Sequence, residues 1–177
     1  TPDNISMEPA RQRGFSMSSV FRLDKGKNKF GVAPGIAFSS SNIHTDVQDW
    51  SFNEDGEIKQ TWQNKDYRKN KVVLTYLGIP LEFQYRGDKD DFKSFKAALG
   101  IRGGWLVDLH TKLKQDNGNK IKRKFIGPFR DYRYGTYLRI GYSRLHFYGY
   151  WGISSVFDAD NAPKTQPLSI GISVTGF

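Results

Sequence analysis

The chain has 177 residues, no cysteine and a formal net charge of +9. Its length fits a single domain, which we expect to span residues 1–177, and the lack of cysteine excludes disulfides and thiolate metal sites. Mean hydropathy is −0.61. No apolar run is long enough for a transmembrane helix, whereas a membrane β-barrel is compatible because its strands are apolar only at alternate positions.

Strict alternation begins near the N-terminus and continues through residue 85. Phe15, Met17, Phe21 and Leu23 share one face of the first expected strand. In residues 29–39 the even positions are mostly bulky and apolar, and the odd positions after Lys29 are Gly, Ala or Ser. In residues 73–85 the odd positions are mostly apolar, from Val73 through Thr75 to Tyr85, and the even ones include polar residues. A period of two residues predicts β-strands.

The same pattern continues to the C-terminal end. A segment starting at Phe95 places Ile101, Trp105, Val107 and Leu109 on one face, opposite glycines and charges. Three further alternating segments cover residues 132–140, 145–153 and 168–174. Seven strands are therefore visible in the sequence.

The composition of the two faces predicts which one faces outward. A soluble, lipocalin-like binding barrel would turn its large apolar side chains inward and cover its outside with polar ones. Here the second face is rich in Gly and Ala with sparse charges of both signs. That composition fits the narrow lumen of an eight-stranded barrel, with the apolar face toward lipid. We therefore predict an all-β, antiparallel, up-and-down transmembrane β-barrel with eight strands.

The links between the strands alternate in length. Short links are expected at residues 24–28, 87–91 and 141–143, and long ones at 40–71, 113–131 and 158–167. Outer-membrane barrels have short periplasmic turns and long external loops, so the last strand should end in the periplasm. The strand at Phe15 then runs inward from outside. We expect an eighth strand upstream of Thr1; the alternative is a seven-stranded barrel closed by parallel pairing of the first and last strands.

Several motifs resemble the PorT-like outer-membrane β-barrel family of Bacteroidetes over residues 30–177. They are YLGIPLEF at 76–83, ALGIRGG at 98–104, HTK at 110–112, RIGY at 139–142 and PLSIGISVTGF at 167–177. The resemblance implies an eight-stranded barrel in the cell outer membrane. One branch of the family takes part in type IX secretion, and others are accessory subunits of envelope complexes. Phe177 resembles the C-terminal aromatic recognised during barrel assembly, although its parity differs from that of Ile172 and Val174.

Five charges fall on the expected lumen face: Glu82, Arg86, Arg102, Asp108 and Arg139. They could form an ion path, but buried charges must be paired, so we favour a structural salt-bridge network. His110 and His146 also face inward without a metal-binding or catalytic motif, and no cofactor, metal or catalytic residue is expected. The glycines at 100, 103 and 104 fit a crowded wall, because no helix follows them to form a phosphate loop.

The link at residues 113–131 is strongly basic. Its candidate lipopolysaccharide contacts are Lys114, Lys120, Lys122, Arg123, Lys124 and Arg130. Near the outer rim they would meet lipopolysaccharide phosphates, but a solvated loop explains them equally well. No groove-entering element or stacking platform indicates nucleic-acid binding.

These observations predict a non-enzymatic integral outer-membrane protein, an accessory or structural subunit of a larger complex for secretion, assembly or transport. Its expected partners are outer-membrane lipid, lipopolysaccharide and other outer-membrane or periplasmic proteins. The alternative is a lipid A-modifying enzyme, which needs a nucleophile and a base near the outer rim. Ser154 and Ser155 are candidates for that nucleophile by residue type alone.

Overall fold

The computed structural model describes residues 13–25, 28–44, 47–52, 58–62, 67–88, 93–115, 120–124, 129–157 and 166–174. The strands in these residues are β1 (Arg13–Val20), β2 (Phe30–His44), β3 (Val47–Phe52), β4 (Ile58–Trp62), β5 (Tyr67–Arg86), β6 (Phe95–Gln115), β7 (Lys120–Lys124), β8 (Tyr132–Tyr142), β9 (Leu145–Gly152) and β10 (Leu168–Val174). No helix in the described residues is long and apolar enough to cross a membrane.

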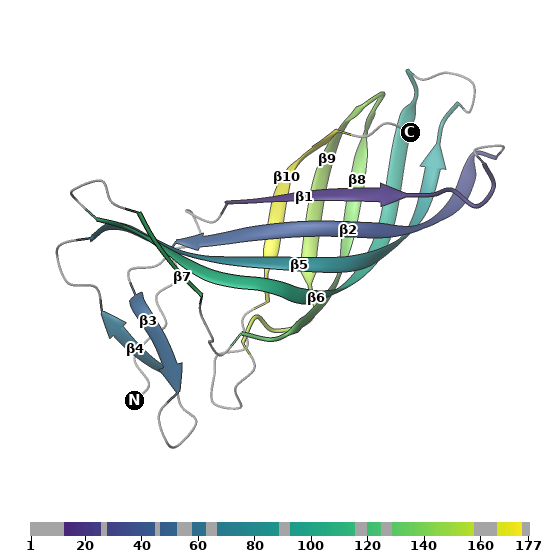
Figure 1. Cartoon of the computed structure of the whole chain (residues 1–177). Coiled ribbons are helices and arrows are strands. Elements are labelled where there is room, and N and C mark those ends of the chain that lie inside the picture. The colour runs from purple at the N-terminus through teal and green to yellow at the C-terminus, as the bar shows by residue number, and fades with distance from the viewer. Residues whose placement is uncertain are drawn as a thin grey trace.

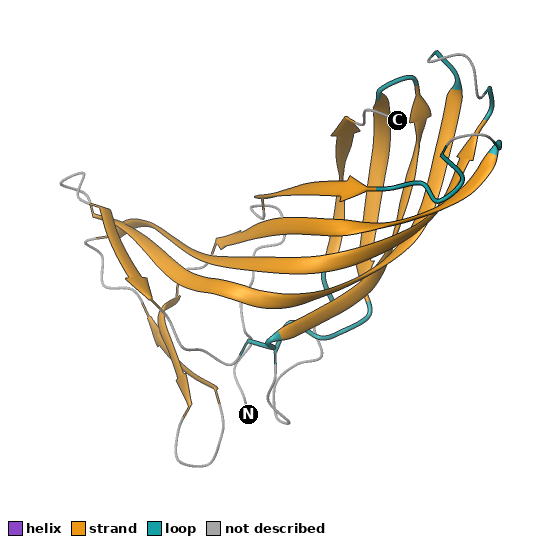
Figure 2. Cartoon of the chain, turned by 45° about the vertical axis from the view of Figure 1, so that its right-hand side comes forward, coloured by secondary structure: helices purple, strands orange, loops and turns teal. Residues whose placement is uncertain are grey.

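Seven of the strands form one continuous antiparallel sheet in the order β1-β2-β5-β6-β8-β9-β10. The sheet curls into a half-barrel, with β8, β9 and β10 bent round behind β1 and β2 (Figures 1 and 2). β7 pairs with β6, and β3 and β4 form a separate two-stranded hairpin. The predicted all-β, antiparallel, up-and-down fold and its seven visible strands are confirmed.

The two faces of the sheet have the polarity opposite to that of a soluble protein. On β5, Leu77, Ile79, Leu81 and Phe83 are exposed, whereas the intervening Glu82 is 1% exposed. The same exposed apolar positions recur on β1, β2, β6, β8, β9 and β10. So large an apolar surface is stable only in an apolar surrounding, and antiparallel pairing satisfies the backbone groups that such a surrounding leaves without water.

Aromatic residues border this apolar surface at both ends. At the end with the short turns, Phe30 is paired with Tyr85 and Phe95 with Tyr142. At the opposite end, Trp105 is paired with Tyr132. On β5 the apolar positions run from residue 77 to 85, roughly 27 Å at about 3.4 Å per residue. At the tilt of roughly 35–45° that barrel strands have, this length spans roughly 19–22 Å of membrane, close to the apolar band of roughly 25 Å that aromatic girdles flank.

Beyond the long-link end of the band, β5 and β6 continue far past the length a membrane strand needs. They have 20 and 21 residues, against about 9–11 for a tilted crossing. A β-bulge marks the change, because Thr75 pairs with Asp108 but Tyr76 pairs with Leu106. The predicted exposure of Val73, Thr75 and Leu109 on the outer face is wrong. Val73 and Thr75 are buried, and Leu109 packs on a buried cluster of Ile43, Val72, Leu74, Tyr76, Phe129 and Phe157.

The links differ from the prediction in the same region. The link predicted at 40–71 contains the end of β2, the hairpin of β3 and β4 and the start of β5, and the link at 113–131 contains β7. These strands are polar, so they lack the alternation by which the others were predicted. The short links are confirmed as turns between β1 and β2, β5 and β6, and β8 and β9, although residues 26–27 and 89–92 lie outside the described residues, as do 158–165.

β1 and β10 form the two edges of the sheet. Within the described residues neither strand pairs with the other, so the parallel closure of a seven-stranded barrel is not observed. The strand expected upstream of Thr1 stays a prediction. Phe177 lies outside the described residues.

Candidate functional site: the inner face of the sheet

Glycines on the inner face make room for tyrosine rings from neighbouring strands. A Cβ added at Gly100 on β6 would overlap the ring of Tyr137 on β8, and one at Gly135 would come within 2.7 Å of the Tyr150 hydroxyl. Gly103 is different, because it has the parity of the exposed Ile101 and Trp105 on the outer face, and nothing lies within 4 Å of its added Cβ. The absence of side chains at Gly100 and Gly135 therefore leaves room for the rings of Tyr137 and Tyr150 on the inner face.

A buried carboxylate organises the middle of this face. Glu82 accepts hydrogen bonds from the Tyr137 hydroxyl at 2.8 Å, from Gln84 Nε2 at 2.8 Å and from Arg139 Nη2, with which it also forms an ion pair. All four side chains are buried. The donors come from β5 itself and from β8, two strands away, so the cluster ties the curved wall together across β6.

Two further arginines occupy the inner face nearer the long-link end. The guanidinium carbon of Arg102 lies 4.9 Å from the centroid of the Tyr150 ring, and that of Arg133 lies 5.4 Å from the same ring. Arg133 also lies 4.3 Å from the Tyr76 ring. Stacked rings attract guanidinium groups and hold them in a fixed orientation.

The five predicted lumen charges do not form one network. Glu82 and Arg139 are paired. Asp108 lies past the bulge, opposite Thr75 on the face away from Tyr76, so its predicted lumen position is wrong, and it pairs with His110 at 2.7 Å. Arg102 donates a hydrogen bond to Ser16 Oγ at 2.8 Å. Arg86 lies at the short-turn end of β5.

Several inner-face residues of this site were not predicted: Gln84, Arg133, Tyr137, Tyr148 and Tyr150. Parity is the signal that could have found those on β8, because Arg133 and Tyr137 have the same parity as Arg139.

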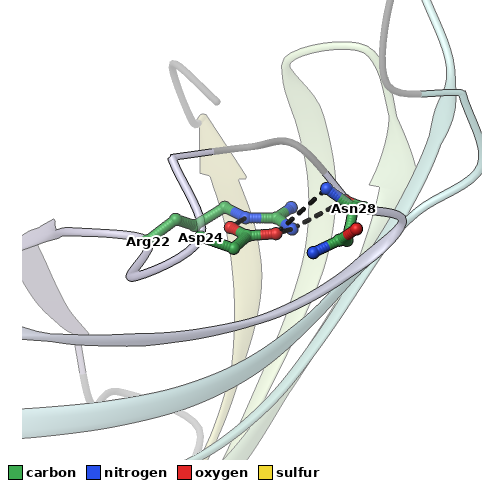
Figure 3. A network of polar contacts seen from close by, with 3 residues as sticks. All are labelled: Arg22, Asp24 and Asn28. Atoms are coloured by element: carbon green, nitrogen blue, oxygen red, sulfur yellow. Dashed lines mark hydrogen bonds and ion pairs between the residues drawn. The ribbon is translucent and has the colours of Figure 1, made fainter.

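A polar network braces the turn between β1 and β2 (Figure 3). Arg22 donates to both carboxylate oxygens of Asp24, at 2.9 and 2.8 Å, and to the Asn28 carbonyl oxygen at 2.8 Å. The Asn28 backbone N–H donates to Asp24 Oδ2 at 3.1 Å. The Arg22 guanidinium covers Gly31, where any Cβ would overlap it. This bidentate pair fixes the turn.

The candidate nucleophiles are engaged with the backbone. Ser154 Oγ accepts the Tyr134 N–H at 3.0 Å and is buried, and Ser155 Oγ accepts the Phe157 N–H at 3.4 Å. His146 is buried on the face that Tyr148 and Tyr150 share, as predicted. His110 is also buried, but past the bulge it lies opposite Val73, on the face away from Leu74 and Tyr76, so its inward prediction is wrong. Within the described residues no group of three or more His, Asp or Glu side chains could hold a metal ion.

The basic link contributes lysines at matching positions on three strands. Lys114 lies opposite Lys69 of β5 and Lys120 of β7. One step nearer the barrel, Lys112 lies opposite Lys71 and Lys122. Directly opposite positions belong to the same face of a sheet, so these six positions form two rows of three along the three strands. We call these six positions the lysine rows.

The three other predicted contacts lie close by. Lys124 is opposite His110, with Arg123 beside it on β7. Arg130 donates to the Tyr132 hydroxyl at 2.8 Å. The side chains of Lys114, Lys120, Lys122, Arg123 and Lys124 lie outside what the structure describes.

Comparison with known proteins agrees with this geometry. Residues 6–158 match the family described as outer membrane protein beta-barrel domain. No curated protein and no solved structure matched the chain. The family match covers most of the chain, and the half-barrel has the exposed apolar band and antiparallel strands that an outer-membrane location requires. The chain belongs to the outer membrane protein β-barrel domain family and is an integral protein of the outer membrane.

Proposed function

We propose that this protein is a non-enzymatic accessory or structural subunit of a larger envelope complex for secretion, assembly or transport. The observation that carries the proposal is the extension of β5, β6 and β7 beyond the apolar band. Leu74 and Phe157 belong to the buried cluster that stiffens its base. A barrel that only spans lipid needs no such extension, whereas a docking subunit needs a rigid surface outside the membrane. The finer likeness to the PorT-like branch of Bacteroidetes rests on the sequence motifs and belongs to the same proposal.

The non-enzymatic part of the proposal rests on how the polar side chains of the inner face are used. The Glu82 carboxylate is occupied by three donors, and the Ser154 hydroxyl is held by the backbone of β8. A catalytic nucleophile needs a base within hydrogen-bonding reach and an open position for substrate. The rival function, lipid A modification, predicts an altered lipid A mass spectrum when the gene is deleted, and our proposal predicts an unchanged one.

We also propose that the lysine rows and neighbouring basic residues bind lipopolysaccharide. Like charges directly opposite one another destabilise a sheet, so three adjacent lysines in a row favour an anionic partner. Lipopolysaccharide phosphates at the outer rim supply that charge, and each contact is charge-assisted. Binding should weaken as salt rises, because exposed charges are screened. Replacing Lys112 and Lys122 by Gln should lower affinity for lipopolysaccharide in detergent, with Lys29→Gln at the opposite end of the barrel as the matched control.

Co-purification tests the subunit function directly. Tagged full-length chain extracted in mild detergent should bring down the same envelope proteins in repeated preparations. The Lys112→Glu, Lys122→Glu double variant alters the extension without touching the apolar band, so it should lose those proteins or retain much less of them. The control variant Lys29→Glu reverses one lysine charge at an exposed position of the short turn, and it should still bring down the same envelope proteins. A chain that purifies alone under every mild condition would contradict the subunit proposal.

A further inference from the structure

Arg102 and Arg133 form a pair of cations on the inner face of the sheet. Both guanidinium groups lie over the Tyr150 ring, and Arg133 also lies over Tyr76. In the described part of the chain neither arginine forms an ion pair. Placing two cations together against a protein wall is unfavourable unless an anion compensates them.

The carboxylates described on β5 and β6 within the sheet are already engaged. Glu82 pairs with Arg139, and the Asp108 carboxylate lies 2.7 Å from His110 Nδ1. Neither is within ion-pair distance of Arg102 or Arg133. The charge of the arginine pair is therefore not neutralised by the carboxylates of this wall.

The hydrogen bonds of the two arginines leave donors available. Arg102 Nη1 donates to Ser16 Oγ at 2.8 Å, and Arg133 donates from Nη2 to Ser39 Oγ at 2.9 Å and from Nη1 to Ser41 Oγ at 3.5 Å. Each guanidinium carries five N–H donors. None of their nitrogens is among the buried atoms that lack a partner, so the remaining donors reach solvent.

A hollow lies where these donors are. It is lined by both arginines with Ser39, Tyr76, Gly78 and Gly104, opens to solvent and has room for about one water-sized group. Gly78 and Gly104 contribute no side chain to fill it. One oxygen of an anionic group fits there, with the rest of the group in the open lumen.

We infer that the Arg102–Arg133 pair is a binding site for an oxyanion, a phosphate or carboxylate group of a ligand that enters the lumen. The planar guanidinium fork matches both groups with paired hydrogen bonds, which lysine cannot do. Stacking on Tyr150 and the serine hydroxyls already hold the forks in place, so little side-chain ordering remains to oppose binding. The inference goes beyond the proposed subunit function and does not depend on it.

Titration of the purified full-length chain in nonionic detergent and phosphate-free, low-salt buffer tests the site. Isothermal calorimetry with inorganic phosphate in one arm and acetate in the other should give saturable binding of at least one of them in the millimolar range or tighter. The arm that binds more tightly identifies the group. Arg133→Gln should weaken binding at least tenfold, and the double variant with Arg102→Gln should abolish it, whereas Lys29→Gln should bind as the unaltered chain does.

A second variant keeps the test decisive if the double variant fails to fold. Tyr150→Leu retains both charges and removes only their shared ring, so it should weaken binding several-fold. Its barrel is verified by faster migration of the unboiled protein on electrophoresis. The inference would be overturned if neither phosphate nor acetate bound saturably, or if the unaltered and double-variant proteins bound equally.

Discussion

Replacing Glu82 by Gln should strongly destabilise the barrel while changing its shape very little. Glu82 is 1% exposed and Arg139 is also buried, so their ion pair is poorly screened by water. Breaking such a pair costs roughly 3–5 kcal/mol. We expect about 3 kcal/mol, the lower end, because a Gln oxygen can still accept the Tyr137 hydroxyl. Its amide nitrogen, however, meets donors from Arg139 and Gln84.

The assay is urea unfolding of the folded chain in lipid vesicles, followed by tryptophan fluorescence. With a slope of about 2 kcal/mol per molar urea, a loss of about 3 kcal/mol lowers the midpoint by about 1.5 M. Asp108→Asn is the matched control, because that side chain is 43% exposed and its pair should be worth less than about 1 kcal/mol. Adding Arg139→Met to Glu82→Gln should recover much of the loss, since the buried cation is gone. A midpoint within 0.3 M of the unaltered chain, on the order of 0.6 kcal/mol, would refute the reasoning.

Three other substitutions probe the wall, the lipid face and the first turn by the same unfolding assay. Gly100→Ala should cost about 1–3 kcal/mol because its methyl overlaps the Tyr137 ring, whereas Gly103→Ala, with open space at its Cβ, should cost less than about 1 kcal/mol. Equal costs at the two glycines would contradict the packing argument. Leu81→Arg, in the middle of the apolar band, should cost about 2–4 kcal/mol in lipid and Leu81→Ile almost nothing; a tolerated arginine would mean that this face does not meet lipid. Arg22→Ala should cost about 1–2 kcal/mol by removing charge-assisted bonds in the first turn, and an unchanged midpoint would show that the turn does not need them.

The sequence was sufficient to predict the face of each membrane strand because side-chain direction in a strand depends only on local parity. Ile79 and Ile101 are on different strands, yet each could be placed toward lipid from its immediate neighbours. The composition of the opposite face then identified the lumen. Neither inference required knowing which strands are adjacent.

The long strands and the inner-face contacts could not be predicted in this way. Outside the membrane no face of a strand meets lipid, so apolar and polar residues need not alternate there. The polar ends of β5 and β6 were therefore predicted to be loops. The bulge between Thr75 and Tyr76 shifts the register of β5 against β6, and a one-residue shift moves every later side chain. Which arginine meets Glu82 depends on the curvature of the whole sheet. Arg139 was placed correctly on the lumen face, but its partner could not be chosen from parity alone.

The open edges of the sheet lead to the last prediction. β1 and β10 each have unpaired backbone groups on one side in the described residues, and an unpaired group in hydrocarbon costs several kcal/mol. Both edges therefore need partners in the membrane, and the question is whether they pair with each other.

The chain has no cysteine, so any disulfide that forms must come from an engineered cysteine pair. Ser18→Cys combined with Ala37→Cys, directly opposite on β2, should form a disulfide on mild oxidation of the folded protein in lipid. Ser18→Cys combined with Ser169→Cys or with Ser173→Cys on β10 should not, because a disulfide needs Cα atoms within about 7 Å. If either β10 pair oxidises as fast as the β1–β2 pair, the two edges meet directly and no other strand separates them.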